Sequence, residues 1–234
     1  MTLTIAKLLG RSFTEYGVSV VNVGSRALFR YARIFQRADD QKPPVKVACI
    51  SDRDIPPDEA KGYVPKTAKQ IKENRPKYES EMQAAGKIDA HMKSLRQYDG
   101  GVVKTFISDR WTLEHDLALA GLGLELHQAI SIAKKLKNTE KAFSQEEYND
   151  IIKESTAEYA TMSNAKQKAD VAAEVYETLF EEGASKAVTA QVLAEILDSQ
   201  KIAVDQLRQK LPPYLIAAIE YVTKPLPPIN SDGN

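Results

Sequence analysis

Val45-Lys-Val-Ala-Cys-Ile50, continued by Ser51-Asp-Arg-Asp-Ile-Pro-Pro57, is the stretch that decides the fold. Its apolar, β-branched first half predicts a buried strand, and the Pro pair ends that strand. Successive side chains of a strand alternate between its faces, so we expect Asp52 and Asp54 on one side and Arg53 on the other. Two carboxylates at a strand end supply the oxygen ligands that Mg²⁺ prefers. The alternative is a solvated turn after a strand.

The composition sets outer limits on the function. A chain of 234 residues suits one large domain or two small ones. Lys plus Arg and Asp plus Glu number 32 each, so net charge neither favours nor excludes nucleic acid. The single cysteine, Cys49, lies in the apolar run, where we expect it in the core of a protein from a reducing compartment. Since no apolar run is long enough to span a membrane and no signal-peptide pattern is present, we expect a cytoplasmic protein without a membrane partner.

The first half of the chain alternates between strand and helix patterns. Strands are predicted at 18–23, 45–50 and 102–107, where β-branched residues are bounded by Gly, Pro or Asp. Helical periodicity at 26–38 and over a long polar stretch, 66–97, separates them. This alternation predicts an α/β fold with a parallel sheet and right-handed crossovers.

The second half shows helix patterns alone. Apolar residues recur at helical spacing from 112 to 183, with Ser144 and Glu147 forming a capping box, and again at 185–197 and 212–222. We therefore expect four segments: a first domain part at 1–117, an inserted all-helical domain at 118–183, a final domain part at 184–223 and a disordered tail at 224–234.

A second group of polar residues follows the third predicted strand. Thr112 is the expected N-cap of a helix, and Glu114 falls in its first turn. If the second and third strands are neighbours, Glu114 lies close to Asp52 and Asp54, and three converging carboxylates require a cation. The alternative for Glu114 is ordinary negative charge at a helix start. We expect His115 at the surface.

Three segments carry a family resemblance. Ile50-Ser-Asp-Arg-Asp-Ile55 and Trp111-Thr-Leu-Glu-His-Asp-Leu-Ala118 resemble the Toprim nuclease domain of the OLD family of ATP-dependent endonucleases. The stretch from Gly10 to Gly24 is also similar. In that family, a Toprim domain follows an ABC-type ATPase. The resemblance implies a Toprim-like parallel sheet flanked by helices, an inserted helical domain, and a metal-dependent endonuclease that cleaves DNA phosphodiesters.

The resemblance also implies site residues. The family's metal ligands correspond to Asp52, Asp54 and Glu114, and its catalytic lysine corresponds to Lys186 within Ser185-Lys-Ala-Val-Thr-Ala-Gln-Val-Leu-Ala194. The implied mechanism uses two Mg²⁺ ions, for which Mn²⁺ or Ca²⁺ can substitute in binding. A solvated lysine at a helix start is the alternative for Lys186.

One departure from the family concerns the start of the domain. Toprim domains open with a strand that brings a glutamate to the metal site, and this chain begins at the helix expected after it, 4–9. We therefore expect a C-terminal piece of a larger protein, whose ATPase domain would be a partner and whose missing glutamate would weaken activity. A Gly-x-x-x-x-Gly-Lys-Ser/Thr motif is absent, which predicts no ATP site in this chain.

Two other functions remain open. A haloacid-dehalogenase-like phosphatase would use Asp52 as its nucleophile, with Ser108 in its second motif. A non-catalytic module would bind DNA or form a homodimer through the helices of 118–183. The lysines of 66–97 could contact a DNA backbone or simply form a solvated helix face.

Overall fold

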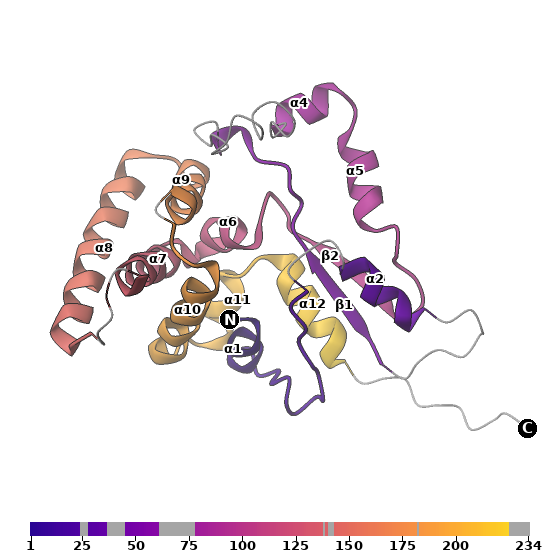
Figure 1. Ribbon diagram of the computed structural model, residues 1–234, viewed down its shortest axis with the longest axis horizontal. Coiled ribbons are helices and arrows are strands. Elements are labelled where there is room, and N and C mark those ends of the chain that lie inside the picture. The colour runs from indigo at the N-terminus through magenta and orange to yellow at the C-terminus, as the bar shows by residue number, and fades with distance from the viewer. Residues whose placement is uncertain are drawn as a thin grey trace, which may run out of the picture.

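The computed structural model describes residues 1–23, 28–36, 45–60, 78–137, 139, 143–181 and 183–224 (Figure 1). Most of these residues are helical, and the sheet has two strands. In chain order the elements are α1 (Thr2–Leu8), α2 (Leu28–Ala32), η1 (Arg33–Phe35), β1 (Val47–Ser51), η2 (Asp58–Ala60), α4 (Glu79–Ala84), α5 (Ile88–Leu95), β2 (Val103–Ile107), α6 (Leu113–Leu117), the π-helical turn η3 (Ala118–Leu122), α7 (Gly123–Lys137), α8 (Gln145–Ala165), α9 (Lys168–Glu181), α10 (Lys186–Gln200), α11 (Val204–Gln209) and α12 (Pro213–Thr223).

The two strands are parallel and in direct register. Val47 pairs with Val103, and Ser51 pairs with Ile107 at the other end. The backbone N–H of Ser108 donates to the carbonyl of Ser51 at 3.0 Å, which extends the pairing by one residue. Both strands therefore end at the same edge of the sheet. An α/β fold with a parallel sheet is confirmed for the described residues.

Helices cover both faces of this sheet. The Phe106 and Tyr221 rings lie 5.8 Å apart, which packs α12 against the strands, and the Tyr221 hydroxyl donates to the Val102 carbonyl at 2.9 Å. Figure 1 shows α12 beside the strands, with α2 on their other side. Ala32 of α2 is buried in one cluster with Cys49, which is 1% exposed. The prediction that Cys49 is a core residue is confirmed.

The main hydrophobic core lies among the helices. Its buried residues come from α1, α7, α9, α10 and α12, and include Ile5, Leu126, Val175, Leu193 and Leu215. Burying one side chain of this size stabilises the fold by about 1.5–3 kcal/mol. The predicted segments 1–117, 118–183 and 184–223 all contribute to this cluster, so the three share one core; their limits as domains stay a prediction.

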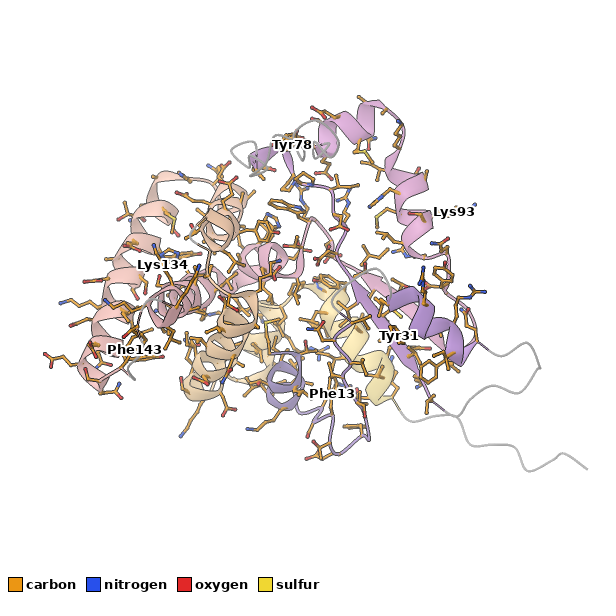
Figure 2. The ribbon with its side chains drawn as sticks, in the orientation of Figure 1. Phe13, Tyr31, Tyr78, Lys93, Lys134 and Phe143 are labelled. Atoms are coloured by element: carbon orange, nitrogen blue, oxygen red, sulfur yellow. The ribbon has the colours of Figure 1, made fainter. Side chains whose placement is uncertain are left out.

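Side-chain exposure follows this arrangement. Figure 2 shows Phe13 near α1 and α12, and this ring is 5% exposed. Tyr31 on α2, also labelled in Figure 2, is 57% exposed. Side chains that face the helical core are thus excluded from water, while the outer side of α2 is solvated.

Three helices begin at residues whose side chains cap their N-termini. The Thr112 hydroxyl accepts from the His115 backbone N–H at 3.3 Å, and Ser144 and Glu147 form the expected capping box. Ser185 caps α10 through the Val188 N–H. Each such cap stabilises its helix by about 1 kcal/mol, because it satisfies an N–H that has no intrahelical partner.

A π-helical turn joins α6 to α7. Gly121 adopts φ 151° and ψ 9° within it, outside the helical region. A side chain at this position would meet Lys210 at 3.2–3.3 Å, so the glycine also allows a close approach of the chain before α12. The sequence predicted one continuous helix face here, and the structure instead interrupts the helix.

Two expected elements are wrong. Residues 18–23 form no strand, and Val20 and Val21 are 51% and 76% exposed. Strand formation needs a partner ladder, and β-propensity alone does not supply one. The long helix predicted at 66–97 is, over its described part, two short helices, α4 and α5, because Gly86 between them adopts a left-handed φ of 61°. Residues 66–77 and the tail after Lys224 lie outside the described residues.

Candidate functional site

The loops that follow β1 and β2 meet at the edge of the sheet. Oδ1 of Asp52, one residue beyond β1, accepts a hydrogen bond from the Leu113 backbone N–H at 3.0 Å. Leu113 is the first residue of α6, where backbone N–H groups lack intrahelical partners and favour a negative charge. Asp52 therefore binds the start of α6 from a different element.

Glu114 and Lys186 complete a cluster with Asp52. Oε1 of Glu114, the second residue of α6, lies 3.1 Å from Nζ of Lys186, the first residue of α10. The lysine ammonium also lies 5.5 Å from the centre of the Tyr176 ring. The Lys186 side chain is 48% exposed and that of Glu114 is 21% exposed, so solvent can reach the pair.

Within this cluster, the pKa of Asp52 is raised well above its ordinary value. Burial, the nearby Glu114 carboxylate and, to a smaller extent, Asp54 raise the pKa of Asp52 to about 6, against the opposing effects of the Leu113 N–H and Lys186. A second carboxylate this close to the partly buried Asp52 makes the pair favourable for a cation.

Asp54 does not lie on an extended strand beside Asp52, as the sequence predicted. The strand ends at Ser51, and Asp54 adopts a left-handed φ of 59° with an exposed side chain. The alternation that would have put Asp52 and Asp54 on one face therefore does not apply beyond Ser51. The structure brings together Asp52, Glu114 and Lys186, while Asp54 acts on Asp52 through its charge.

The carboxylates of this cluster fit a hydrated Mg²⁺. This ion usually keeps several waters and is bound by one or two protein carboxylates together with substrate phosphates. Asp52 and Glu114 supply two such groups. Over the described ranges, no cluster of three or more His, Cys, Asp or Glu side chains has the arrangement of a metal site. The donor set is thus enough for one hydrated ion that shares its coordination with a ligand.

Arg53 supports the site and was not singled out from the sequence. It is 8% exposed, and its guanidinium lies 3.0 Å from the Glu79 carboxylate and donates to the Asp109 carbonyl at 3.2 Å. The carbonyl of Arg53 bonds to the His91 ring at 2.6 Å. These contacts fix α4 and α5 against the loop that carries Asp52. The partners are remote in sequence, so no local pattern could reveal them.

His115 is buried, and the expectation of a surface position is wrong. It is 1% exposed, and its Nδ1 lies 3.1 Å from Asp116 Oδ1. The Trp111 ring lies 5.7 Å away and packs edge-on against Tyr176 of α9. Helix α9 covers this side of α6, so the histidine faces the interior. The His-Asp neighbourhood in the sequence was the available signal, since a buried imidazole needs a partner.

Tyr214 is buried within electrostatic reach of the carboxylates of the site. It follows Pro213 at the start of α12 and is 7% exposed, and its backbone N–H partly offsets the rise that burial and Asp116 cause in the pKa of Asp109. Burial and the charges of nearby carboxylates, Asp116 first and then Asp52, raise its pKa. Nothing near Tyr214 in the sequence points to this location.

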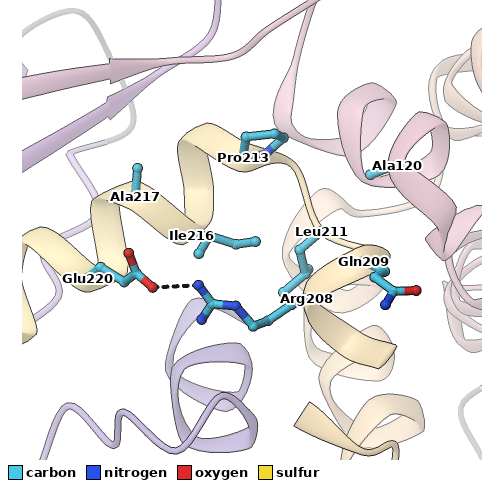
Figure 3. Close-up of a pocket in the computed structure, with 8 residues that line it drawn as sticks. All are labelled: Ala120, Arg208, Gln209, Leu211, Pro213, Ile216, Ala217 and Glu220. Atoms are coloured by element: carbon cyan, nitrogen blue, oxygen red, sulfur yellow. Dashed lines mark hydrogen bonds and ion pairs between the residues drawn. The ribbon is translucent and has the colours of Figure 1, made fainter. Parts of the chain in front are cut away.

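A separate hollow lies beside α11 and α12. It has a volume of about 450 Å³, and Figure 3 shows its aliphatic lining, including Leu211 and Ile216, next to the Arg208 and Glu220 side chains. Those two groups are joined by a hydrogen bond of 2.5 Å. The hollow shares no lining residue with the Asp52 cluster, and its charged groups neutralise each other.

Comparisons with protein-family models, with curated proteins and with solved structures give no match for this chain. None of the helices within the described ranges combines the length and apolarity needed to cross a bilayer.

Proposed function

We propose that this chain is a divalent-metal-dependent DNA endonuclease region with a Toprim-like fold. The observation that supports the proposal is the convergence of Asp52, Glu114 and Lys186 from three separate elements at the carboxyl edge of a parallel sheet. Ligands of open α/β sheets bind at this edge. The carboxylates are the ligand type for Mg²⁺, and a solvent-accessible lysine beside them suits a phosphate group.

Each residue has a defined role in this proposal. Mg²⁺, or Mn²⁺ in its place, would polarise the scissile phosphate and activate water. Asp52 and Glu114 would hold this ion, and Asp54 would hold a second ion together with oxygens of the substrate. Lys186 exchanges Glu114 for a phosphate oxygen and neutralises charge that develops there. The Leu113 N–H keeps the Asp52 carboxylate oriented throughout.

The proposal includes partners. The substrate is the DNA backbone, which requires no base-specific contact for cleavage. The ATPase domain of the same full-length protein and a second copy of the chain are further proposed partners, and the proposed location is the cytoplasm.

The geometry is less favourable to the phosphatase alternative. That mechanism needs the Ser108 hydroxyl to bind a phosphate beside Asp52. The hydroxyl instead donates to the Trp111 carbonyl at 2.7 Å and accepts from the Arg53 backbone N–H at 2.7 Å, and it is buried. Its hydrogen-bonding capacity is used to join the two loops.

Plasmid nicking tests the proposal. Supercoiled DNA is incubated with the chain and Mg²⁺ or Mn²⁺, in parallel with Asp52→Ala, Asp54→Ala and the matched control Asp198→Ala, whose carboxylate lies in an exposed pair with Lys7. We expect metal-dependent nicking that Asp198→Ala retains and both site variants lose. Hydrolysis of a small phosphomonoester without nicking would support the phosphatase. Equal nicking by Asp52→Ala would refute the assigned site.

A further inference from the structure

The same four residues, Ile-Ser-Asp-Arg, occur where each strand of the sheet ends. They are residues 50–53 after β1 and residues 107–110 after β2. Because the strands are parallel and in register, the two copies end side by side. Arg53 directly follows Asp52, and Arg110 lies in the loop that leads to α6. Both guanidinium groups therefore belong to the loops that carry the proposed site.

A single carboxylate, that of Glu79 at the start of α4, lies between the two arginines. Its Oε1 is 3.0 Å from Nη2 of Arg53, and its Oε2 is 3.3 Å from Nη2 of Arg110. The Arg53 side chain is 10% exposed, whereas that of Arg110 is 38% exposed and that of Glu79 is 26% exposed. Solvent therefore reaches the Arg110 end of this cluster, while Arg53 is enclosed.

Arg53 has a hydrogen-bond donor that the described residues leave unused. Its Nη1 donates to the Asp109 carbonyl, its Nη2 faces Glu79, and its Nε is buried without a hydrogen-bond partner in the described part of the chain. Nε–H and one N–H of Nη2 point the same way from the planar guanidinium, which matches the two oxygens of a carboxylate. Glu79 occupies half of this fork, because its other oxygen is beside Arg110. An unpaired buried donor is unfavourable, so a complete fork would be more stable.

Arg110 engages its carboxylates through one nitrogen. Glu79 at 3.3 Å and Glu59 at 3.6 Å both approach Nη2. Among the described residues, no side-chain hydrogen bond or ion pair involves the Nε or Nη1 of Arg110. Since a guanidinium carries five N–H donors in a fork that suits a phosphate, Arg110 can bind two phosphate oxygens.

We propose that Arg110 binds a phosphate of the DNA backbone close to the scissile one, and that DNA binding moves Glu79 onto the Nε–Nη2 edge of Arg53. Each guanidinium then has a complete acceptor, a carboxylate for the buried arginine and a phosphate for the accessible one. Arg110 lies three residues before Leu113, whose N–H binds Asp52, and this stretch of chain spans at most about 11 Å. The inference rests on the proposed function, since it takes DNA as the substrate.

DNA affinity tests the phosphate contact. A fluorescently labelled duplex is titrated with the chain in Ca²⁺, and binding is followed by anisotropy at several salt concentrations. We expect Arg110→Gln to bind DNA about 10-fold more weakly and to lower the slope of the salt dependence by about 1, because one phosphate contact is lost. Arg208→Gln, from a similarly exposed pair with Glu220, is the matched control and should bind as the wild type does.

Removing the competing carboxylate should have the opposite effect. Glu79→Gln should bind DNA up to about 5-fold more tightly, because a partly exposed ion pair no longer holds Arg110. Glu220→Gln is its control and should leave DNA affinity unchanged. Glu59→Gln releases Arg110 without changing the Arg53 pair, so it makes the same test if Glu79→Gln does not fold.

The outcomes separate this inference from the proposed function. If the wild type binds DNA and Arg110→Gln binds it equally well, the role of Arg110 is overturned while the nuclease proposal stands. Folded Glu79→Gln and Glu59→Gln variants that bind no more tightly than the wild type would overturn the exchange of Glu79. If the wild-type chain neither binds nor nicks DNA, the proposed function fails, and the phosphate contact fails with it.

Discussion

Asp52 and Leu113 are joined by a 3.0 Å hydrogen bond between the Asp52 carboxylate and the Leu113 backbone N–H. The bond connects the end of β1 to the first residue of α6. It therefore fixes the distance between the two parts of the chain that carry the acidic side chains of the site. A change at this junction should alter both parts at once.

The stability of the metal-free protein should depend on the protonation of Asp52. Its pKa in the folded state is raised from 3.8 to about 6, so the folded protein holds this proton more tightly than the unfolded chain does. The contribution of Asp52 is therefore favourable below about pH 4 and is lost as pH rises through about 6. At pH 8, Asp52→Asn should raise the free energy of unfolding by about 2 kcal/mol.

Urea unfolding at pH 5 and pH 8 checks this prediction. The gain from Asp52→Asn should shrink at the lower pH, whereas Asp198→Asn, in an exposed pair with Lys7, should show no such change. Saturating Mg²⁺ should stabilise the wild type and not the Asp52→Asn variant. An equal gain at both pH values would contradict the raised pKa.

Removing the Lys186 charge should affect activity far more than stability. The Lys186–Glu114 pair is solvent-accessible, and such pairs contribute at most about 1 kcal/mol to folding. Lys186→Met should lower the nicking rate at least about 100-fold, because a lost phosphate contact acts on the transition state. Lys7→Met removes a lysine from an equally short but more exposed pair and is the matched control. Comparable rates for the two variants would count against the assignment of Lys186.

The buried Arg53 should contribute strongly to the stability of the fold. Arg53→Met leaves Glu79 without its closest cationic partner and removes the bond to the Asp109 carbonyl. We expect a loss of roughly 3 kcal/mol in the free energy of unfolding, because one member of a largely buried ion pair is removed. Arg208→Met breaks the more exposed pair with Glu220 and should cost under about 1 kcal/mol. Chemical denaturation of both variants measures the difference.

The shared core predicts cooperative unfolding. Leu197 of α10 is fully buried in a cluster that includes residues of α1, α7, α9 and α12. Leu197→Ala should cost about 2–5 kcal/mol, and a single transition should persist by circular dichroism and by tryptophan fluorescence. Leu136→Ala, at a 38% exposed position, is the control. Separate transitions for the two probes would show that the helical segments fold independently.

Local features of the chain could be predicted from the sequence. Thr112 and Ser144 cap helices because their hydroxyls satisfy backbone donors within three residues, and this depends only on the nearby sequence. Cys49 is buried because it lies in an apolar run between β-branched residues. The approach of Asp52 to the start of α6 followed from the parallel pairing of two strands.

Features that depend on distant partners could not be predicted. The valines at 18–23 have strand propensity, yet the described structure gives them no ladder. The burial of His115 depends on α9 covering one side of α6, and the burial of Arg53 depends on Glu79. Tyr214 reaches the site because α12 returns to the sheet after the whole helical segment. In each case, the contact that sets the position of the residue joins segments that are far apart in the sequence. A short sequence pattern therefore cannot reveal it.

The kink at Gly121 separates α6 from α7. Gly121 has φ 151°, a backbone conformation that other residues rarely adopt, so the helix axis can change direction there. The kink acts as a joint, which lets α6 place Glu114 beside Lys186 while α7 packs Leu126 in the core. Gly121→Val should strain that joint, leaving helical content by circular dichroism nearly unchanged while Mn²⁺ affinity is lost. Retained Mn²⁺ binding in the Gly121→Val variant would show that α6 is oriented by its own contacts alone.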